Sequence, residues 1–580
     1  MAEGMYRWTK RRLRHQLAVI RGEASPSIVL KNATYLNSVR REWLQANIWI
    51  YQDRIIYVGE AMPTNMKNTE IVDCSKLFIV PGYIEHHAHP FQLYNPHTFA
   101  KYAAKRGTTT FINDNLQLFL YLDKKKALSL IEEMDKFPTS MYWWCRYDAQ
   151  SELDAEEEIF TNSRLKEWLE HQLVVQGGEL TSWPKVLAGD DVILHWMQET
   201  RRLGKPIEGH LPGASERTLT QMALLGVTSD HEAINGKEVI SRLNLGYTTS
   251  LRYSSIRPDL PQILEEMLEL GVKNFRHCLF TTDGGTPAFY EQGVIDKMIA
   301  IAIEKGVPII DAYEMATYNV ANYYKLDSKL GMIAPGRIAH LNFLESIENP
   351  VPVSVMAKGE WLLKNRFTCF DDWRFPWEDY GFERLNLEWD LTSDDLHFSM
   401  PVGIELVNSV ILKPYQISVE DAEDTLSFDH DESFFAMIDK NGKWLINTMI
   451  KGFASGVSGL ASSYSVNGDI VLIGKSKQDM KVAFRALKEQ GGGVVIVENE
   501  EVISRIVLPL NGFISDKEMP ELIEEEKAVA KSLRERGYKF DDPFYTLLFF
   551  GATHLPYVRV TERGIYDVHK KSILFPSIMR

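Results

Sequence analysis

The stretch that decides the fold is Pro81-Gly-Tyr-Ile-Glu-His-His-Ala-His89, which follows the apolar run Leu77-Phe-Ile-Val80. Side chains two positions apart on a strand point to the same face. His87 and His89 are therefore expected to lie side by side, while His86 faces the other way and is expected to be structural. Because two imidazoles at a strand end can bind one divalent ion, the stretch predicts a metal site.

Downstream of this stretch, β-rich runs alternate with helical patterns over about 250 residues. Thr108–Asn113 and Phe275–Thr281 are predicted strands, and Asp191–Leu203 and Ile295–Lys305 are predicted helices. Trp183–Leu187 is also predicted to be a strand. This alternation predicts an α/β fold with a (β/α)8 TIM-like barrel. A doubly wound open sheet is the alternative, but no Gly-x-Gly-x-x-Gly follows the first strand.

The sequence on either side of the predicted barrel is rich in short strands. We expect these two parts to join into one composite β module, and a further α/β domain to form the C-terminus. The predicted divisions are an N-terminal helix with the first part of the module (1–80), the barrel (81–330), the second part of the module (331–365), a connection (366–395) and the C-terminal domain (396–580).

Composition and charge exclude several classes of protein. The chain has 580 residues, of which 64 are basic and 79 acidic, giving a net charge of −15. The electrostatic field of a chain with this negative net charge does not attract nucleic-acid phosphates. No apolar run approaches the roughly 20 residues of a membrane span. The apolar run Leu17–Ile20 is too short for a signal peptide, which favours a cytoplasmic protein. The four scattered cysteines predict neither disulfides nor a structural zinc site.

Polar residues also close three later β-like runs. They are His210, the pair His231 and Glu232, and Asp283. Each could be a buried structural residue or a helix cap, but their shared position at strand ends is where a barrel places catalytic groups. Glu179 lies just before the predicted strand Trp183–Leu187, and taken alone it would be a solvated loop residue.

The chain resembles the adenine deaminases of the amidohydrolase superfamily along nearly its whole length. The family signature Pro-Gly-x-x-Asp-x-His-x-His appears as Pro81 to His89, with Glu85 in place of the aspartate. Other matching motifs are Gly209-His-Leu-Pro-Gly213, Ser229-Asp-His-Glu232, Thr282-Asp283, Gly491-Gly-Gly493 and Leu508-Pro-Leu510. The last two lie in the C-terminal domain, so the resemblance extends beyond the barrel.

The resemblance implies a binuclear centre of divalent metal, with manganese or iron expected first and zinc as an alternative. His87, His89 and Asp283 would bind one ion, His210 and His231 the other, and Glu179 would bridge them. Asp283 would also be the catalytic base and Glu232 a catalytic acid. The implied reaction is hydrolysis of adenine to hypoxanthine and ammonia in purine salvage. The implied partners are a small purine-like substrate and further copies of the chain in a homo-oligomer, with no nucleic acid and no membrane.

Several polar residues that the family places near the substrate are replaced here, by Phe91, Leu93, Val294 and Val466. A metal-dependent amidohydrolase that acts on another cyclic amide or aminated heterocycle is therefore an alternative. A non-catalytic protein on a decayed barrel is a second one, although the retained metal-ligand set argues against it. The nucleic-acid deaminase fold is excluded because the chain has no Pro-Cys-x-x-Cys.

Overall fold

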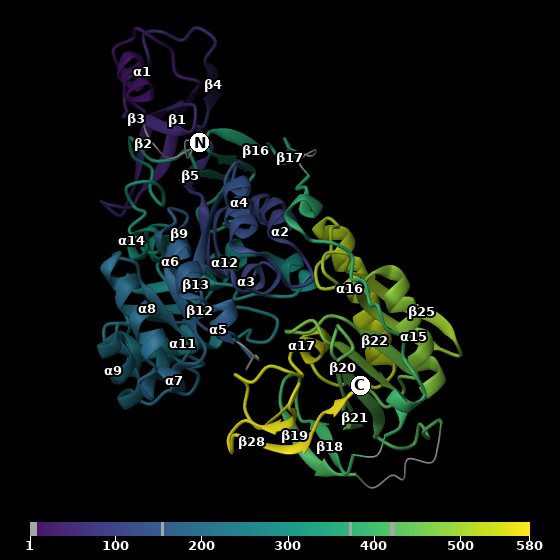
Figure 1. Ribbon diagram of the computed structural model, residues 1–580. Coiled ribbons are helices and arrows are strands. Elements are labelled where there is room, and N and C mark those ends of the chain that lie inside the picture. The colour runs from purple at the N-terminus through teal and green to yellow at the C-terminus, as the bar shows by residue number, and fades with distance from the viewer. Residues whose placement is uncertain (1–8, 152–155, 371–373, 399, 418–423) are drawn as a thin grey trace.

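The computed structural model describes residues 9–151, 156–370, 374–398, 400–417 and 424–580. A β module, a barrel and a C-terminal domain follow one another along the chain (Figure 1). The predicted divisions 1–80, 81–330, 366–395 and 396–580 each include a few residues outside the described ranges. No helix within these ranges is both long and apolar enough to span a bilayer.

The barrel consists of eight parallel strands that pair in chain order from β6 to β13. Every residue of these strands is buried, as expected for parallel strands that side chains and helices cover on both faces. The predicted α/β barrel fold is confirmed. The strands are β6 (Tyr83–Ala88), β7 (Thr108–Asn113), β8 (Ser140–Cys145), β9 (Val174–Leu180), β10 (Ile207–Gly209), β11 (Ser229–Asp230), β12 (Thr248–Arg252) and β13 (Cys278–Thr281).

Helices follow most barrel strands and form the outer layer. The amphipathic helices include α2 (Pro96–Ala104), α4 (Lys124–Met134), α6 (Asn162–Glu170), α8 (Asp191–Arg202), α9 (Glu216–Leu225), α10 (Gly236–Asn244), α11 (Leu260–Glu269) and α12 (Ile295–Glu304). Side-chain oxygens cap the N-termini of several of them, as in α9, where Ser215 accepts a hydrogen bond from the Thr218 amide.

The buried side chain of Glu85 links the first and last strands of the barrel. Its Oε1 accepts hydrogen bonds from the His87 amide at 3.0 Å and the Thr281 hydroxyl at 2.7 Å. Its Oε2 accepts from the Thr282 amide at 2.8 Å and the Thr282 hydroxyl at 2.7 Å. Glu85 therefore joins β6 to the end of β13, and we call this contact the seam.

Strands from both flanks of the barrel form one composite sheet. In it, β5 lies between β1, to which it is parallel, and β14, to which it is antiparallel. A basic helix, α1 (Lys10–Ile20), precedes the sheet and buries Val19. The strands are β1 (Ile28–Asn37), β2 (Glu42–Tyr51), β3 (Arg54–Gly59), β4 (Glu70–Asp73), β5 (Phe78–Pro81), β14 (Leu341–Leu344), β15 (Ser354–Ala357), β16 (Glu360–Lys364) and β17 (Phe367–Thr368).

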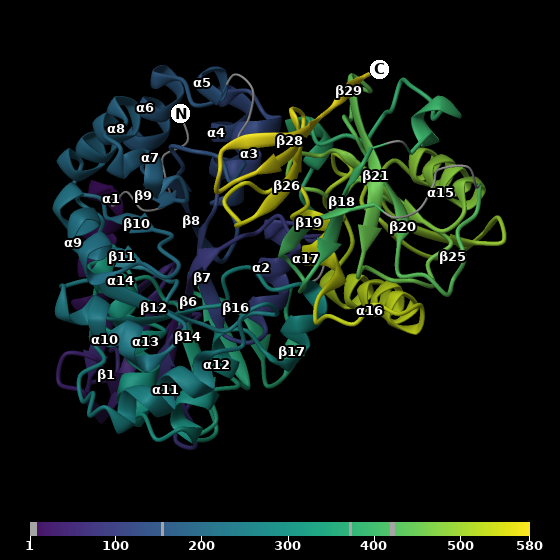
Figure 2. The same cartoon turned by 90° about the horizontal axis from the view of Figure 1, so that it is seen from below.

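The C-terminal domain packs beside the barrel, at the end where the parallel strands terminate (Figure 2). Asn95 Nδ2, after β6, donates to the Ser515 carbonyl at 3.0 Å, and the His554 amide donates to the Gln150 carbonyl at 3.2 Å. The domain contains a nine-stranded sheet (β18–β25 and β29), a three-stranded sheet (β26–β28) and the helices α15 (Lys477–Gln490), α16 (Met519–Glu535) and α17 (Pro543–Leu548).

The strands of that larger sheet differ in burial: those in the middle are almost entirely buried, whereas the segments Leu412–Gln416 and Glu501–Val507 at its edges are mostly exposed. The strands are β18 (Val402–Leu406), β19 (Leu412–Gln416), β20 (Ser433–Ile438), β21 (Trp444–Lys451), β22 (Gly459–Ser462), β23 (Ile470–Gly474), β24 (Gly493–Glu498) and β25 (Glu501–Val507), with β29 (Ile578–Met579) added beside β21. The smaller sheet holds β26 (Val558–Thr561), β27 (Gly564–Asp567) and β28 (Ser572–Pro576).

One strand prediction is wrong. Trp183–Leu187 is the short helix α7, and the barrel strand is the preceding segment, β9. Pro184 in the first turn explains the difference, because proline suits a helix start but removes a hydrogen bond from a sheet. Glu179 therefore lies near the end of a buried strand and not in a loop before one.

Candidate metal centre

Each of the eight barrel strands brings a charged or metal-ligating residue to its carboxyl end, on the strand or directly after it. Parallel strands that close into a barrel present these ends on one face, so side chains from all eight converge there. The residues are His87 and His89 from β6, Asp114 from β7, Arg146 from β8, Glu179 from β9, His210 from β10, His231 and Glu232 from β11, Arg252 from β12, and Asp283 from β13.

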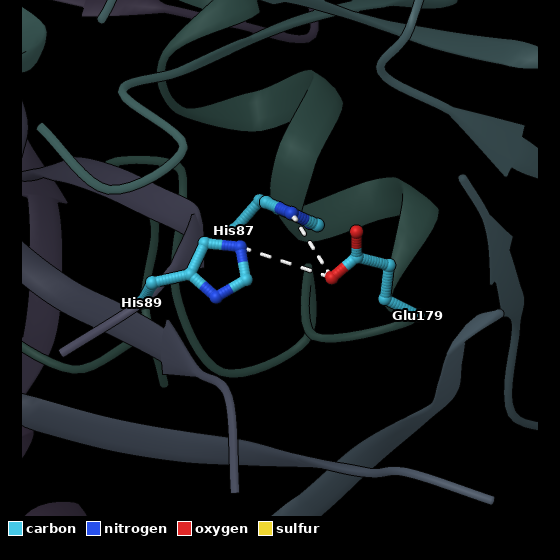
Figure 3. Close-up of side chains that lie close together, drawn as sticks. All are labelled: His87, His89 and Glu179. Atoms are coloured by element: carbon cyan, nitrogen blue, oxygen red, sulfur yellow. Dashed lines mark ion pairs between the residues drawn. The ribbon is translucent and has the colours of Figure 1, made fainter. Parts of the chain in front are cut away.

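The Glu179 carboxylate lies between two pairs of imidazoles. Its Oε2 is 3.9 Å from His87 Nε2 and 3.8 Å from His89 Nε2. Dashed lines mark these two contacts in Figure 3. Its Oε1 is 2.7 Å from His210 Nδ1 and 3.4 Å from His231 Nε2. Each oxygen thus faces one pair, which is the arrangement that a carboxylate bridging two ions requires.

Asp283 stands on the side of the first pair. Its Oδ1 lies 3.2 Å from His87 Nε2 and 3.1 Å from His89 Nε2. Its backbone has a φ of 52°, a left-handed conformation that aspartate and asparagine tolerate better than most residues. Burial favours the neutral acid, but Arg252 and the two imidazoles hold the pKa of Asp283 well below its usual range. The side chain is therefore an ionised carboxylate.

Carboxylates behind the histidines fix which nitrogen points inward. Glu208 contacts His87 Nδ1 at 3.0 Å through Oε2 and His231 Nδ1 at 3.2 Å through Oε1. Asp114 contacts His89 Nδ1 at 3.0 Å. An ionised carboxylate only accepts hydrogen bonds, so each of these Nδ1 atoms carries a proton, and Nε2 is the atom that would bind an ion after losing its own proton.

These donors fit a divalent metal. His87 Nε2 is fully buried, and its one close contact, with Asp283 Oδ1 at 3.2 Å, does not have hydrogen-bond geometry in the described part of the chain. Three groups have ligand atoms within 4.8 Å of one another: His87 with His89 and Glu179, His87 with His231 and Asp283, and Glu179 with His210 and His231. Ligands bound at about 2.0–2.2 Å from one ion lie roughly 3–4 Å apart. Imidazole and carboxylate donors suit manganese, iron and zinc alike.

Two buried arginines separate the acidic residues of the site. Arg146 Nη2 lies 2.7 Å from Asp114 and 2.6 Å from Glu179. Arg252 Nη1 lies 2.5 Å from Glu232 and 2.7 Å from Asp283. Although burial works in the other direction, Arg252 and the histidines lower the pKa of Glu232. This pairing favours the carboxylate, so it does not support Glu232 as a proton donor.

Sequence reasoning missed four residues that hold this site together: Asp114, Arg146, Glu208 and Arg252. Asp114 directly follows the predicted strand Thr108–Asn113, so the strand-end rule could have found it. Arg146 directly follows a strand that was not predicted, Arg252 is the last residue of another such strand, and Glu208 lies inside a strand. His86 was placed correctly, since its Nδ1 contacts the Tyr324 hydroxyl at 3.2 Å, away from the site.

A small cavity lies beside His89 and Asp114, at the boundary between the barrel and the C-terminal domain. Both domains contribute to its lining, which includes Phe91, Gln92 and Gln117 from the barrel side and Val466, Phe513 and Leu548 from the C-terminal side.

Two family models match the chain. The amidohydrolase family matches residues 78–362, and the adenine deaminase C-terminal domain matches residues 410–572. A relative from Halalkalibacterium halodurans, named "Putative adenine deaminase", is 68% identical and aligns over 100% of both chains. A protein of the same name from Bacillus subtilis is 50% identical, again over 100% of both chains. The adenine deaminase of Bacillus velezensis is 25% identical over 96% of this chain and 98% of its own.

The chain belongs to the adenine deaminase family of amidohydrolases. As an amidohydrolase it is a hydrolase, and the family together with the His/carboxylate cluster implies a divalent metal. In this family member, Phe91 and Val466 line the cavity, whereas Leu93 and Val294 are not among its lining residues. Only two of the four apolar replacements noted in the sequence therefore border the space beside the metal centre.

Proposed function

We propose that the protein hydrolyses adenine to hypoxanthine and ammonia at the centre formed by His87, His89, Glu179, His210, His231 and Asp283. The observation that carries this proposal is that the two oxygens of Glu179 each face one pair of imidazoles, with Asp283 beside the first pair. The relatives named adenine deaminase and the match to the adenine deaminase C-terminal domain support adenine as the substrate.

His87, His89, Glu179, His210, His231 and Asp283 would hold the divalent metal, which would supply Lewis acidity and make water a stronger nucleophile at neutral pH. Asp283 takes a proton from the water that attacks C6 of the purine and delivers a proton to the departing amine. Arg252 keeps Asp283 ionised before the reaction by its contact at 2.7 Å. One water is consumed and one ammonia is released, so the reaction needs no other co-reactant.

Hydrolysis of another cyclic amide or aminated heterocycle is the second candidate. The observation that favours it is that Phe91 and Val466 line the cavity where family members carry polar groups. A manganese-, iron- or zinc-loaded site, a cytoplasmic role in purine salvage and a homo-oligomeric assembly stay predictions from the sequence.

Ammonia release is the direct test of the proposal. Purified protein loaded with manganese or iron should release ammonia from adenine, and elemental analysis should find up to two ions per chain. Other aminopurines and cyclic amides should be assayed in parallel. Ring opening of a cyclic amide, or ammonia from another aminated heterocycle, together with no ammonia from adenine with either metal would refute the adenine proposal in favour of the second candidate.

A further inference from the structure

The cavity beside His89 has apolar walls on both sides of the domain boundary. Phe91 and Leu116 come from the barrel side, and Phe513 and Leu548 come from the C-terminal domain. Aromatic and aliphatic side chains on opposite sides of a small cavity suit a flat ring, which can stack without needing polar partners on its faces. A planar heterocycle still needs hydrogen-bond partners along its edge.

Gln117 lines this cavity and carries a hydrogen-bonding atom that is unpaired among the described residues. It lies in the first turn of α3 (Leu116–Tyr121), and its Oε1 is buried without a hydrogen-bond partner among the described residues. A buried carbonyl oxygen without a partner is unfavourable, so such an atom is usually satisfied by water or a ligand. A glutamine amide pairs an acceptor with a donor, the combination that glutamine uses to contact the amino group and ring nitrogen of adenine in nucleic acids.

Gln92 lines the same cavity and is held by a tyrosine of the C-terminal domain. The hydroxyl of Tyr545, on α17, lies 2.7 Å from Gln92 Oε1 and also contacts the Gly284 carbonyl, which follows Asp283. A phenol has one proton, so one of these two contacts must use another donor, and the Gln92 amide can supply it. In either orientation, Tyr545 holds one end of the amide, and the other end has no partner in the described residues.

We propose that the ring of the substrate lies in this cavity, that Gln92 and Gln117 hydrogen-bond its edge nitrogens, and that Tyr545 is a positioning residue that orients Gln92. The proposal rests on the proposed function and names the residues that would select a nitrogen heterocycle. The C-terminal domain then contributes to substrate choice through one hydroxyl group, although the metal ligands all come from the barrel.

Analogues that lack single ring nitrogens provide the test. Purine and its 1-, 3- and 7-deaza analogues have no amine to release, so their dissociation constants can be measured by calorimetry on manganese-loaded protein. The proteins are the wild type, Gln92→Leu, Gln117→Leu, Tyr545→Phe and the control Gln45→Leu, which changes an exposed glutamine of β2. Ammonia release from adenine and metal content are measured on the same samples.

We expect each glutamine variant to bind purine about 5- to 100-fold more weakly, and Tyr545→Phe about 2- to 10-fold more weakly, with unchanged metal content. The decisive result is non-additivity. At least one deaza analogue should bind the wild type at least 5-fold more weakly than purine does. This difference should vanish in the variant that lacks the glutamine which contacts the missing nitrogen. Tyr545→Phe removes one oxygen atom only, so it tests the proposal even if a glutamine variant fails to fold.

The outcomes separate the two proposals. A wild type that deaminates adenine, but whose deaza penalties are the same in every variant, would refute the cavity assignment alone. A wild type that neither binds purine nor deaminates adenine would refute the proposed function and this assignment with it. Weaker binding of purine to the control variant Gln45→Leu would show that the losses of affinity are not specific to the cavity. This result would also overturn the assignment.

Discussion

Asp283 combines three properties at one position: an ionised carboxylate, contact with both histidines of the first pair, and a left-handed backbone. The backbone decides which substitution is informative. Asparagine tolerates a φ of 52°, whereas alanine there would add strain to the loss of the carboxylate.

Replacing Asp283 by asparagine should leave the fold intact and lower kcat by about 10²- to 10⁴-fold, the usual contribution of a general base. Steady-state kinetics with adenine check this, with metal content measured on the same sample. Turnover above about a tenth of the wild-type value would show that another group is the base.

Glu208 is not a proposed metal ligand, but it contacts the Nδ1 atoms of two histidines that are. In Glu208→Gln, the amide oxygen still accepts from one imidazole, but the other loses its acceptor, and the orientation of that ring is no longer fixed. We expect manganese affinity to fall about 10- to 100-fold, as for other partners of metal-binding histidines.

Competition with a chelator measures that affinity. The matched control is Glu269→Gln, which makes the same change at an exposed position at the end of α11. An unchanged dissociation constant in Glu208→Gln would mean that Glu208 supports only the fold.

At the scale of elements, the seam between β6 and β13 depends on one side chain. Glu85→Ala would leave the amides of His87 and Thr282 without their buried acceptor, whereas the hydroxyls of Thr281 and Thr282 would keep their contacts with the His87 carbonyl and the Tyr290 hydroxyl. Since each unpaired buried group costs about 1–3 kcal/mol, we expect a loss of about 3 kcal/mol or more in the free energy of unfolding.

The urea midpoint of unfolding measures the loss, and Glu60→Ala, at an exposed position just after β3, serves as the control. Equal midpoints for the two variants would show that the barrel closes without Glu85.

The strands and the site were predictable to different extents, and the reasons are physical. Thr108–Asn113 is found at its predicted bounds because its β-branched run precedes a polar turn. β9 was missed because Gly177 and Gly178 interrupt its apolar pattern, while the helix after it carries a more apolar run. Buried parallel strands lack the alternation of polar and apolar residues that reveals strands open to water.

Site residues at strand ends were predictable because a barrel brings those ends together wherever they stand in the sequence. Glu208 was not predictable by that rule, since it lies within a strand and its role depends on a contact with His87, 121 positions away. Tyr545 was not predictable either, because its position depends on how the C-terminal domain packs on the barrel.

At the scale of the whole molecule, the domain boundary buries an ionisable group near the site. Glu526, on α16, accepts a hydrogen bond from the Ala288 amide at 2.5 Å, in the 3₁₀ helix Pro287–Gln292 that follows Asp283. Burial and the nearby Asp542 raise the pKa of Glu526 to about 8. An unfolded chain would lose this proton near pH 4.5, the ordinary value for glutamate.

Between about pH 4.5 and 8 the folded chain therefore holds a proton that the unfolded chain has released, and stability falls as pH rises through this window. Glu526→Gln stays neutral and escapes this loss. We expect its Tm advantage over the wild type to grow from pH 5 to pH 8 and to level off above.

Calorimetry across that pH range checks the expectation, with the exposed Glu524→Gln as control. A Tm difference that does not vary with pH would show that Glu526 is already ionised in the folded protein.

The composite sheet has a consequence for how the protein is made. β5 ends at Pro81, and its antiparallel neighbour β14 begins at Leu341, which is 260 positions later. At about 5–20 residues per second, a ribosome needs roughly 13 to 50 s to span that interval. Throughout this time one edge of the nascent sheet lacks its native neighbour and is open to pairing with other chains. The sheet that precedes the barrel is therefore completed only after the whole barrel has been translated.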